Sequence, residues 1–315
     1  MLQLQRWCLG SVIIALVVIM SGSAHAQGAW VGDAKSLTVD LGYAYIPYDL
    51  VVENPNKNSD AKIADPATTN HVVTLGVEYV PIENLSIDAS VPFLSTSWDG
   101  TVGSHFPKGK WDDGSSHYTF TDFRIGARYQ LLDAPILAVS PYAAFSTPLQ
   151  NYEVIGFATG GRHLTAGHLG VSIGRTLDPV LPNLFFMATY EFTFAQSYNP
   201  DPTNAPEVAT INQNRSDVDA EIGYLFLNGD LSVNVATEWR HQHHGISFDK
   251  AGQVDPALFL WHDGILKESY NMLGGGASYA INRKLTVTAA ARFFIQGYNT
   301  RDQTYYGLDL AYRAL

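Results

Sequence analysis

Apolar residues occupy alternate positions over long stretches of this chain. Between residues 37 and 45 they are Leu37, Val39, Leu41, Tyr43 and Tyr45, and the residues between them are small or polar. Successive side chains of a β-strand point to opposite faces, whereas a helix would spread this pattern around its axis. The alternation therefore predicts a strand with one apolar and one polar face.

The same alternation recurs to the end of the chain. We expect strands over residues 37–45, 73–79, 85–93, 122–131, 136–147, 164–177, 184–196, 216–227, 230–242, 270–281, 285–297 and 303–314. The fifth and tenth are the least regular, because Pro141 interrupts one and Gly274, Gly275 and Gly276 interrupt the other. The predicted fold class is all-β: a transmembrane antiparallel up-and-down β-barrel of about twelve strands, an even number as in bacterial outer-membrane barrels.

Long and short connections alternate between these strands. Tight turns are expected at 80–84, 132–135, 178–183, 228–229 and 281–283, and the Asn228-Gly229 pair is a strong hairpin signal. Longer connections cover 48–70, 97–117, 148–163, 197–215 and 243–268, and the last one, near 298–302, is short. Outer-membrane barrels have short periplasmic turns and long outer loops. We therefore expect both termini in the periplasm.

Tyrosines gather near the ends of the even-numbered strands, on the apolar face. They are Tyr79, Tyr129, Tyr224, Tyr279 and Tyr312. A tyrosine at a membrane interface keeps its hydroxyl in water and its ring in lipid. These positions predict a tyrosine belt at the end of the barrel that carries the short turns.

The first residues have the features of a secretory signal peptide. Arg6 precedes an apolar run over 7–20, and Ala24 and Ala26 fit the small-residue rule for cleavage. The run is shorter than the roughly 20 residues that a membrane-spanning helix needs. We expect residues 1–26 to be a signal peptide and residues 27–315 to form one outer-membrane β-barrel domain. Residues 27–35 are too few for a plug domain.

Composition and charge narrow the class of protein. Charged residues make up 16% of the chain, below the roughly 25% of soluble domains. The single cysteine, Cys8, lies in the predicted signal peptide, so the mature chain is expected to hold no disulfide and no cysteine-bound metal. A net charge of −11 argues against nucleic acid as a partner.

The last strand suggests where the chain is inserted. Tyr306, Leu308, Leu310 and Tyr312 alternate with Gly307, Asp309, Ala311 and Arg313, as in the terminal strand that the outer-membrane barrel assembly machinery recognises. We expect the protein in the cell outer membrane. Its expected partners there are that machinery, outer-membrane lipid and lipopolysaccharide.

The polar faces of the strands predict a charged lumen. The candidate residues for its lining and constriction are Glu78, Asp88, Asp122, Arg124, Arg128, Glu191, Glu221, Glu238, Arg240, Arg292 and Arg313. Arg124 and Arg128 share one strand, and together with Asp122, Glu78 and Asp88 they are predicted to form the constriction. Because acidic residues oppose the arginines, strong anion selectivity is not expected.

Strand number leaves two functions open. A barrel of sixteen or more strands encloses an aqueous channel, and one of eight is nearly filled by side chains. A barrel between these sizes suits a porin-like channel for passive passage of small solutes, which is the function we expect. The alternative is a lumen closed by salt bridges, with a structural or adhesive role for the loops.

The predicted outer loops carry residues that could serve other roles. The aromatic residues Trp98, Phe106, Trp111 and Tyr118 either fold inward as a constriction or cap the rim. A histidine cluster, His241, His243 and His244, suits a solvated rim better than a metal site.

An outer-membrane hydrolase is the remaining alternative for the loops. The polar residues that it would use are His105, Asp112, Asp113, His117 and His262. No G-x-S-x-G nucleophile motif is present. We therefore expect no enzyme activity, no metal site and no cofactor.

Three segments carry a family resemblance. TDFRIGARYQLLD (121–133), SPYAAFSTPLQNYE (140–153) and GRTLDPVLP (174–182) resemble an outer-membrane β-barrel transporter group named for the MetA pathway of phenol degradation. The resemblance implies passage of small solutes, including aromatic or apolar compounds, across the outer membrane. The shared motifs are structural, so the resemblance assigns no binding residues.

Overall fold

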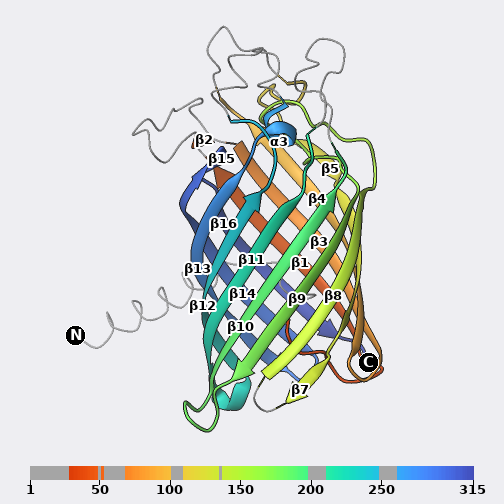
Figure 1. Ribbon diagram of the computed structural model, residues 1–315, viewed down its shortest axis with the longest axis vertical. Coiled ribbons are helices and arrows are strands. Elements are labelled where there is room, and N and C mark those ends of the chain that lie inside the picture. The colour runs from red at the N-terminus through yellow and green to blue at the C-terminus, as the bar shows by residue number, and fades with distance from the viewer. Residues whose placement is uncertain are drawn as a thin grey trace, which may run out of the picture.

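The computed structural model describes residues 28–48, 51–52, 68–100, 109–134, 137–197, 211–247 and 261–315. These residues form a closed antiparallel β-barrel (Figure 1). The predicted signal peptide, residues 1–26, lies outside the described residues. So do parts of the predicted loops, with Phe106 and His105 among them.

The barrel strands follow one another around the wall in chain order. They are β1 Leu37–Tyr48, β3 Thr68–Ile82, β4 Leu85–Trp98, β5 His117–Phe120, β6 Asp122–Tyr129, β7 Leu132–Ala134, β8 Leu137–Pro148, β9 Ala166–Thr176, β10 Leu184–Ala195, β11 Arg215–Phe226, β12 Leu231–Gln242, β13 Ser269–Asn282, β14 Leu285–Tyr298 and β16 Thr304–Arg313. Two short strands, β2 Val51–Val52 and β15 Thr300–Arg301, pair with each other outside this wall.

The predicted number of twelve strands is confirmed. The fourth strand of the wall consists of three segments, because β5 and β6 both pair with β4 while β6 and β7 both pair with β8. With these three counted as one, the fourteen-membered sheet has twelve strands. Pairing of β1 with β16, from Thr38 opposite Arg313 to Tyr45 opposite Tyr306, closes the cylinder.

The two irregular strands also form as predicted. Pro141 lies within β8, on the outward-facing parity, and is paired in register with Val171 of β9. Gly274, Gly275 and Gly276 lie within β13, and an added Cβ at Gly274 would meet the Ala291 carbonyl oxygen at 1.8 Å. Glycine there allows β13 and β14 to approach closely.

Several strands extend further toward the long connections than the alternation indicated. The second runs over Thr68–Ile82 instead of 73–79, and the third ends at Trp98 instead of residue 93. Residues beyond the apolar part of these strands are mostly Thr, Ser and Asn, which lack the alternation. The hydrogen-bonded ladder continues past the apolar band, so hydropathy alone understates strand length.

The two ends of the barrel differ in their connections (Figure 1). We call the end with the short connections, such as Glu83-Asn84 and the η3 turn Leu227–Gly229, the turn end. The other end, to which the connections after β4, β8 and β12 belong, is the loop end. Asn228 and Gly229 both have positive φ, as the predicted hairpin requires. The alternation of short and long connections is confirmed.

The outer surface of the barrel is apolar. Large side chains at outward positions are exposed, among them Leu41 at 50%, Leu75 at 52% and Leu169 at 54%. A band of this kind around a closed barrel fits contact with lipid. The five predicted tyrosines all lie exposed at the turn end, for example Tyr129 opposite Leu85. In the part of the chain that is described, no helix is long and apolar enough to cross a membrane.

Candidate solute path through the barrel

The inner face is formed by the alternate residues that the strand period turns away from lipid. On β11 these include Arg215, Asp217, Asp219 and Glu221, four successive inward positions. Because the strands tilt around the barrel, charged residues from distant parts of the chain lie side by side in the lumen. Two groups of ion pairs result, one on β6 to β10 and one on β11 to β14.

Glu191 on β10 is the centre of the first group. Its carboxylate accepts hydrogen bonds from Arg124 Nη2 on β6 at 2.7 Å and from the Tyr142 hydroxyl on β8 at 3.0 Å. His168 Nδ1 on β9 lies 2.9 Å from the same carboxylate. Glycine at position 170 leaves room for this arrangement, since a Cβ there would lie 2.3 Å from the Tyr142 ring. Four strands are thus joined by one buried carboxylate.

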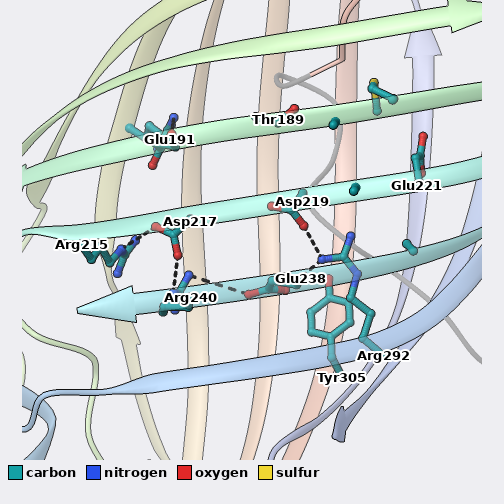
Figure 2. A pocket seen from close by; sticks show the side chains of 15 residues that line it. Thr189, Glu191, Arg215, Asp217, Asp219, Glu221, Glu238, Arg240, Arg292 and Tyr305 are labelled. Atoms are coloured by element: carbon teal, nitrogen blue, oxygen red, sulfur yellow. Dashed lines mark hydrogen bonds and ion pairs between the residues drawn. The ribbon is translucent and has the colours of Figure 1, made fainter. Parts of the chain in front are cut away.

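The second group is a ladder of alternating charges on β11, β12 and β14 (Figure 2). Asp217 pairs with Arg215 at 2.9 Å and with Arg240 at 2.5 Å. Arg292 pairs with Asp219 at 2.7 Å and with Glu238 at 2.9 Å. These pairs hold the long arginine side chains against the wall, so they leave open space beside them.

Two adjoining cavities lie inside this charged wall. The first, of about 250 Å³, is bounded by both groups of ion pairs and by Met187 and Tyr305. The second, of about 440 Å³, lies against β1, β3 and β4 and is bounded by Asp40, Asp88 and other residues. Arg124, Arg215 and Tyr305 line both cavities. The two cavities therefore share part of their lining, and both leave room inside the barrel for water and small solutes.

The predicted residues separate into three places. Arg124, Glu191, Glu221, Glu238, Arg240 and Arg292 line the first cavity, and Glu78, Asp88, Asp122 and Arg124 line the second. Arg128 lines neither, because it is buried, with 1% of its surface exposed, and pairs with Glu78 at 2.9 Å. Arg313 lies at the turn end and pairs with the exposed Asp33 at 2.5 Å.

The residues predicted for the constriction lie on neighbouring strands, but they do not all contact one another. Asp88 lies opposite Gly126 in the register, between Arg124 and Arg128 of the neighbouring strand. The two arginines, however, have different partners: Arg124 reaches across to Glu191, and Arg128 pairs with Glu78. Asp122 accepts a hydrogen bond from the Tyr152 hydroxyl at 2.5 Å, nearer the loop end.

Several lining residues were not among the predicted candidates. Arg215 and Asp217 share the inward parity of Glu221, which would have identified them, although the predicted strand began at residue 216. Tyr305, which lines both cavities, carries no charge, and neither does Tyr142, which donates to Glu191, so a search for charged inward positions passes over them.

The connection after β8 folds over the loop end of the lumen. Within it, Tyr152, Phe157 and Ala158 are all nearly fully buried, and Phe157 stacks on Trp98 with ring centroids 5.0 Å apart. The Tyr48 hydroxyl donates to the Phe157 carbonyl oxygen at 2.9 Å. We call residues 149–165, with Asp112, Trp98 and α3 His262–Ile265 packed against them, the cap.

Of the aromatic residues predicted for the outer loops, Trp98 takes part in the cap. Tyr118 is 63% exposed and stacks on Phe93 at the outer face, and Trp111 stacks on His117. Asp112, considered above for a hydrolase, is buried and accepts three backbone N–H groups, from Gly109, Phe157 and Ala158. That carboxylate is thereby occupied in holding the cap.

Charged groups also line a smaller cavity of about 180 Å³ under the cap. Arg301 pairs with Asp263 at 2.8 Å, and Thr159 donates to the same carboxylate at 2.7 Å. Burial acts to raise the pKa of Asp263, but Arg301, His262 and the Thr159 hydrogen bond outweigh it, so the pKa lies below its usual value. Asp263 is therefore ionised at neutral pH, and its carboxylate links α3 to Arg301 and Thr159.

Two residues of the histidine cluster, His241 and His243, lie on the outer face of the wall. His241 and His243 have ring centroids 5.2 Å apart, His241 stacks on Trp239, and His243 Nε2 lies 2.9 Å from the Ser216 hydroxyl. Among the described residues, no group of three or more His, Cys, Asp or Glu side chains is arranged to hold a metal ion.

Comparison with known proteins rests on structure. No protein-family model matches the sequence, and no curated protein matches it. An outer-membrane channel from Pseudomonas putida F1 superimposes with a TM-score of 0.67 at 12% identity, covering 90% of this chain and 97% of that one. This chain has the outer-membrane β-barrel fold.

Two further structures support the fold. The NanC porin matches with a TM-score of 0.50 at 10% identity, over 87% of this chain and 98% of that chain. The β-domain of the Bordetella autotransporter BrkA matches with a TM-score of 0.50 at 8% identity, over 89% of this chain and all 100% of that chain. Since identities are this low, these similarities establish the architecture alone, and membership of the MetA-pathway group stays a prediction.

Proposed function

We propose that this protein is an outer-membrane channel through which small solutes diffuse. The observation that carries the proposal is the pair of adjoining cavities, about 250 and 440 Å³, that share Arg124, Arg215 and Tyr305 inside a closed barrel. A lumen whose charges are held flat against the wall by ion pairs has room for water. Passage by diffusion needs no cofactor and no chemical step.

The charge of the lining favours cations. Ten carboxylate side chains and four arginines line the two cavities, which is an excess of six formal negative charges among these residues. Fixed carboxylates in a narrow, low-dielectric passage raise the local concentration of cations and exclude anions. We therefore expect a channel that is selective for cations and that also passes small neutral solutes.

The larger cavity suits the aromatic or apolar compounds that the family resemblance implies. Beside its carboxylates it is bordered by Ala44, Val72, Ala89 and Pro92. A small ring could lie against this apolar strip while its polar groups contact the charged wall. This second class of solute is proposed alongside small cations.

The narrow point of the path is proposed at the Arg124–Glu191 pair. Arg124 lines both cavities, so its side chain stands where they meet, and the 2.7 Å contact with Glu191 fixes it there. Removing the guanidinium would widen this point and remove one of the four positive charges of the lining. Arg124 therefore replaces the Arg124 and Arg128 pair as the proposed constriction.

Orientation and cellular setting complete the proposal. The apolar outer band and tyrosine belt support insertion in the outer membrane, in contact with its lipid and with lipopolysaccharide. We propose that the turn end faces the periplasm, that residues 1–26 are removed on secretion and that the barrel assembly machinery inserts the chain.

Liposome swelling tests the proposal. Proteoliposomes holding the folded barrel are mixed with isotonic solutes of increasing size, and light scattering reports uptake. We expect swelling with the smallest sugars and amino acids that slows as solute size increases. Arg124→Ala should speed the uptake of the larger solutes, whereas the matched control Arg313→Ala, at the turn end outside both cavities, should not.

A folded barrel that admits no solute would refute the channel. Folding is checked by the shift in gel mobility between heated and unheated samples and by β-rich circular dichroism. A folded, impermeable barrel would favour the closed lumen, with the loops left as the functional part.

A further inference from the structure

Residues 28–31 lie against the inner wall of the barrel near the turn end. We call them the luminal segment. Ala29 is fully buried, at 0% exposure, although it belongs to no strand and precedes the first one by several residues. The side chains around it come from β6, β8 and β10 and from the residue Gln130 that follows β6.

Polar side chains of the wall bind the main chain of the segment. Arg128 Nη1 donates to the Gly28 carbonyl oxygen, and Ser140 Oγ donates to the Ala29 carbonyl oxygen at 2.6 Å. The Val31 amide donates to Gln130 Oε1 at 2.7 Å. The Ala29 amide points at Met187 Sδ, 3.2 Å away. Every one of these contacts is to backbone, so the wall recognises main chain more than a particular side chain.

The shape of the wall fits the segment as well. Gly174 of β9 faces inward, and a Cβ added there would lie 2.7 Å from Ala29 Cβ and 2.6 Å from Trp30 Cη2. Real Cβ atoms do not approach other carbons so closely, so any larger residue at position 174 would have to displace the segment. Only glycine at position 174 leaves room for the luminal segment.

The segment borders the solute path. Met187, which accepts the Ala29 amide, also lines the cavity of about 250 Å³. The segment therefore stands between that cavity and the turn end. Its attachment is modest, because three of its four polar contacts are made by uncharged side chains, whose hydrogen bonds compete with water, and Trp30 is 41% exposed.

We propose that the inner wall formed by Arg128, Gln130, Ser140, Gly174 and Met187 is a binding site for a short segment of main chain, and that the luminal segment occupies it as a releasable plug of the channel. This inference rests on the proposed channel function. The buried Arg128, which lines neither cavity, thereby acquires a role in holding the plug. Release of residues 28–31 extends the cavity toward the turn end.

Gly174→Ala tests the plug, because it should raise the conductance although it adds volume to the lumen. The added methyl group fills space and would by itself narrow the lumen, but it displaces the segment. In planar bilayers we expect the single-channel conductance of Gly174→Ala to exceed that of the unaltered protein severalfold. The matched control is Gly167→Ala on the same strand, where an added Cβ meets nothing within 4 Å. Unchanged or lower conductance for Gly174→Ala would overturn the proposal.

Thiol labelling gives a readout that is independent of conductance. In a Cys8→Ser background, Ser140→Cys places a thiol at a position that is 0% exposed beneath the segment. We expect a water-soluble thiol reagent to label it slowly, and at least an order of magnitude faster when Gly174→Ala is added. Ser90→Cys, in the larger cavity, should label at the same rate in both backgrounds.

The two readouts separate the two proposals. Faster labelling at position 140 with no conductance in any variant would retain the plug and reject the channel. Conductance that is present but insensitive to Gly174→Ala, with position 140 equally protected in both backgrounds, would reject the plug and retain the channel. If Gly174→Ala does not fold, deletion of residues 28–31 is put through the same two assays with the same expected results.

Discussion

The two ends of the lumen are narrowed in different ways. At the loop end, the cap buries Phe157 against Trp98 and encloses the Asp112 carboxylate, which three backbone N–H groups contact. At the turn end, the luminal segment buries only Ala29 completely and is held by hydrogen bonds to its backbone. The difference is between a packed core and a short bound segment of main chain.

This comparison indicates which end can open. Removing the cap would expose stacked aromatic rings and a buried carboxylate, both costly. Removing the luminal segment would exchange a few hydrogen bonds with protein for hydrogen bonds with water. The cap is therefore a fixed part of the barrel wall at the loop end, and the segment is the element that moves.

Removing the aromatic ring of Phe157 should destabilise the cap more than any other single change. Phe157 is 3% exposed and stacked on Trp98, and Phe→Ala in a packed core costs about 3–5 kcal/mol. We expect Phe157→Ala to make residues 149–165 susceptible to protease while the barrel stays folded. Phe120→Ala, at an exposed outer position, is the control and should leave cleavage unchanged. Equal resistance of both variants would show that the cap is not a packed unit.

Loss of the buried carboxylate is the next test of the cap. Asp112 is 2% exposed, and each hydrogen bond to a charged group contributes about 1.5–3 kcal/mol. We expect Asp112→Ala to accelerate hydrogen exchange of the Phe157 and Ala158 amides, which donate to it. The neighbouring Asp113→Ala removes an exposed carboxylate that bonds to the nearby Ser115 and His117, and it should not accelerate exchange of these amides. Protection that survives Asp112→Ala would contradict the role given to this residue.

Acid should weaken the cap through Asp263. Its pKa in the folded protein lies below the usual value of about 4, because Arg301, His262 and Thr159 together outweigh burial. The stabilisation is therefore complete above the unfolded pKa and is lost as the pH falls through the lowered folded value. We expect protease resistance of residues 149–165 to be constant at neutral pH and to fall in acid, below about pH 4. In Asp263→Asn the acid-dependent loss should be smaller, and an unchanged acid profile would exclude this carboxylate as its origin.

Breaking the ion pair between Arg313 and Asp33 at the turn end should have the smallest effect on stability. Arg313 and Asp33 are largely exposed, and exposed ion pairs contribute less than about 1 kcal/mol. Arg313→Ala should leave urea unfolding of the barrel unchanged and should not alter labelling at position 140. A large loss of stability would contradict the view that the turn end is held less tightly than the cap at the loop end.

The barrel could be predicted from sequence because its main signal is local. Alternation such as that of Leu37, Val39 and Leu41 depends only on the period of a strand, and it predicted every strand of the wall and the parity of the inward residues. Even Pro141 did not break the pattern, because it faces outward in β8. The tyrosine belt followed from the same parity.

The alternation could not predict how far along the barrel axis each inward side chain lies, or which residue it contacts across the lumen. Arg124 and Arg128 share a face and a strand, yet one meets Glu191, 67 positions away, and the other meets Gly28, 100 positions away. Strand tilt and register decide such contacts, and alternation contains neither. The luminal segment was missed for the same reason: residues 27–35 are too short for a domain, but four of them suffice to fill a groove.

The central claim is that the lumen conducts, and single-channel recording tests it most directly. The folded protein is inserted into a planar bilayer between potassium chloride solutions of unequal concentration. We expect discrete conductance steps with a reversal potential of the sign that indicates cation selectivity, because the cavities carry ten carboxylates and four arginines. A correctly folded, inserted barrel that shows no steps would contradict it.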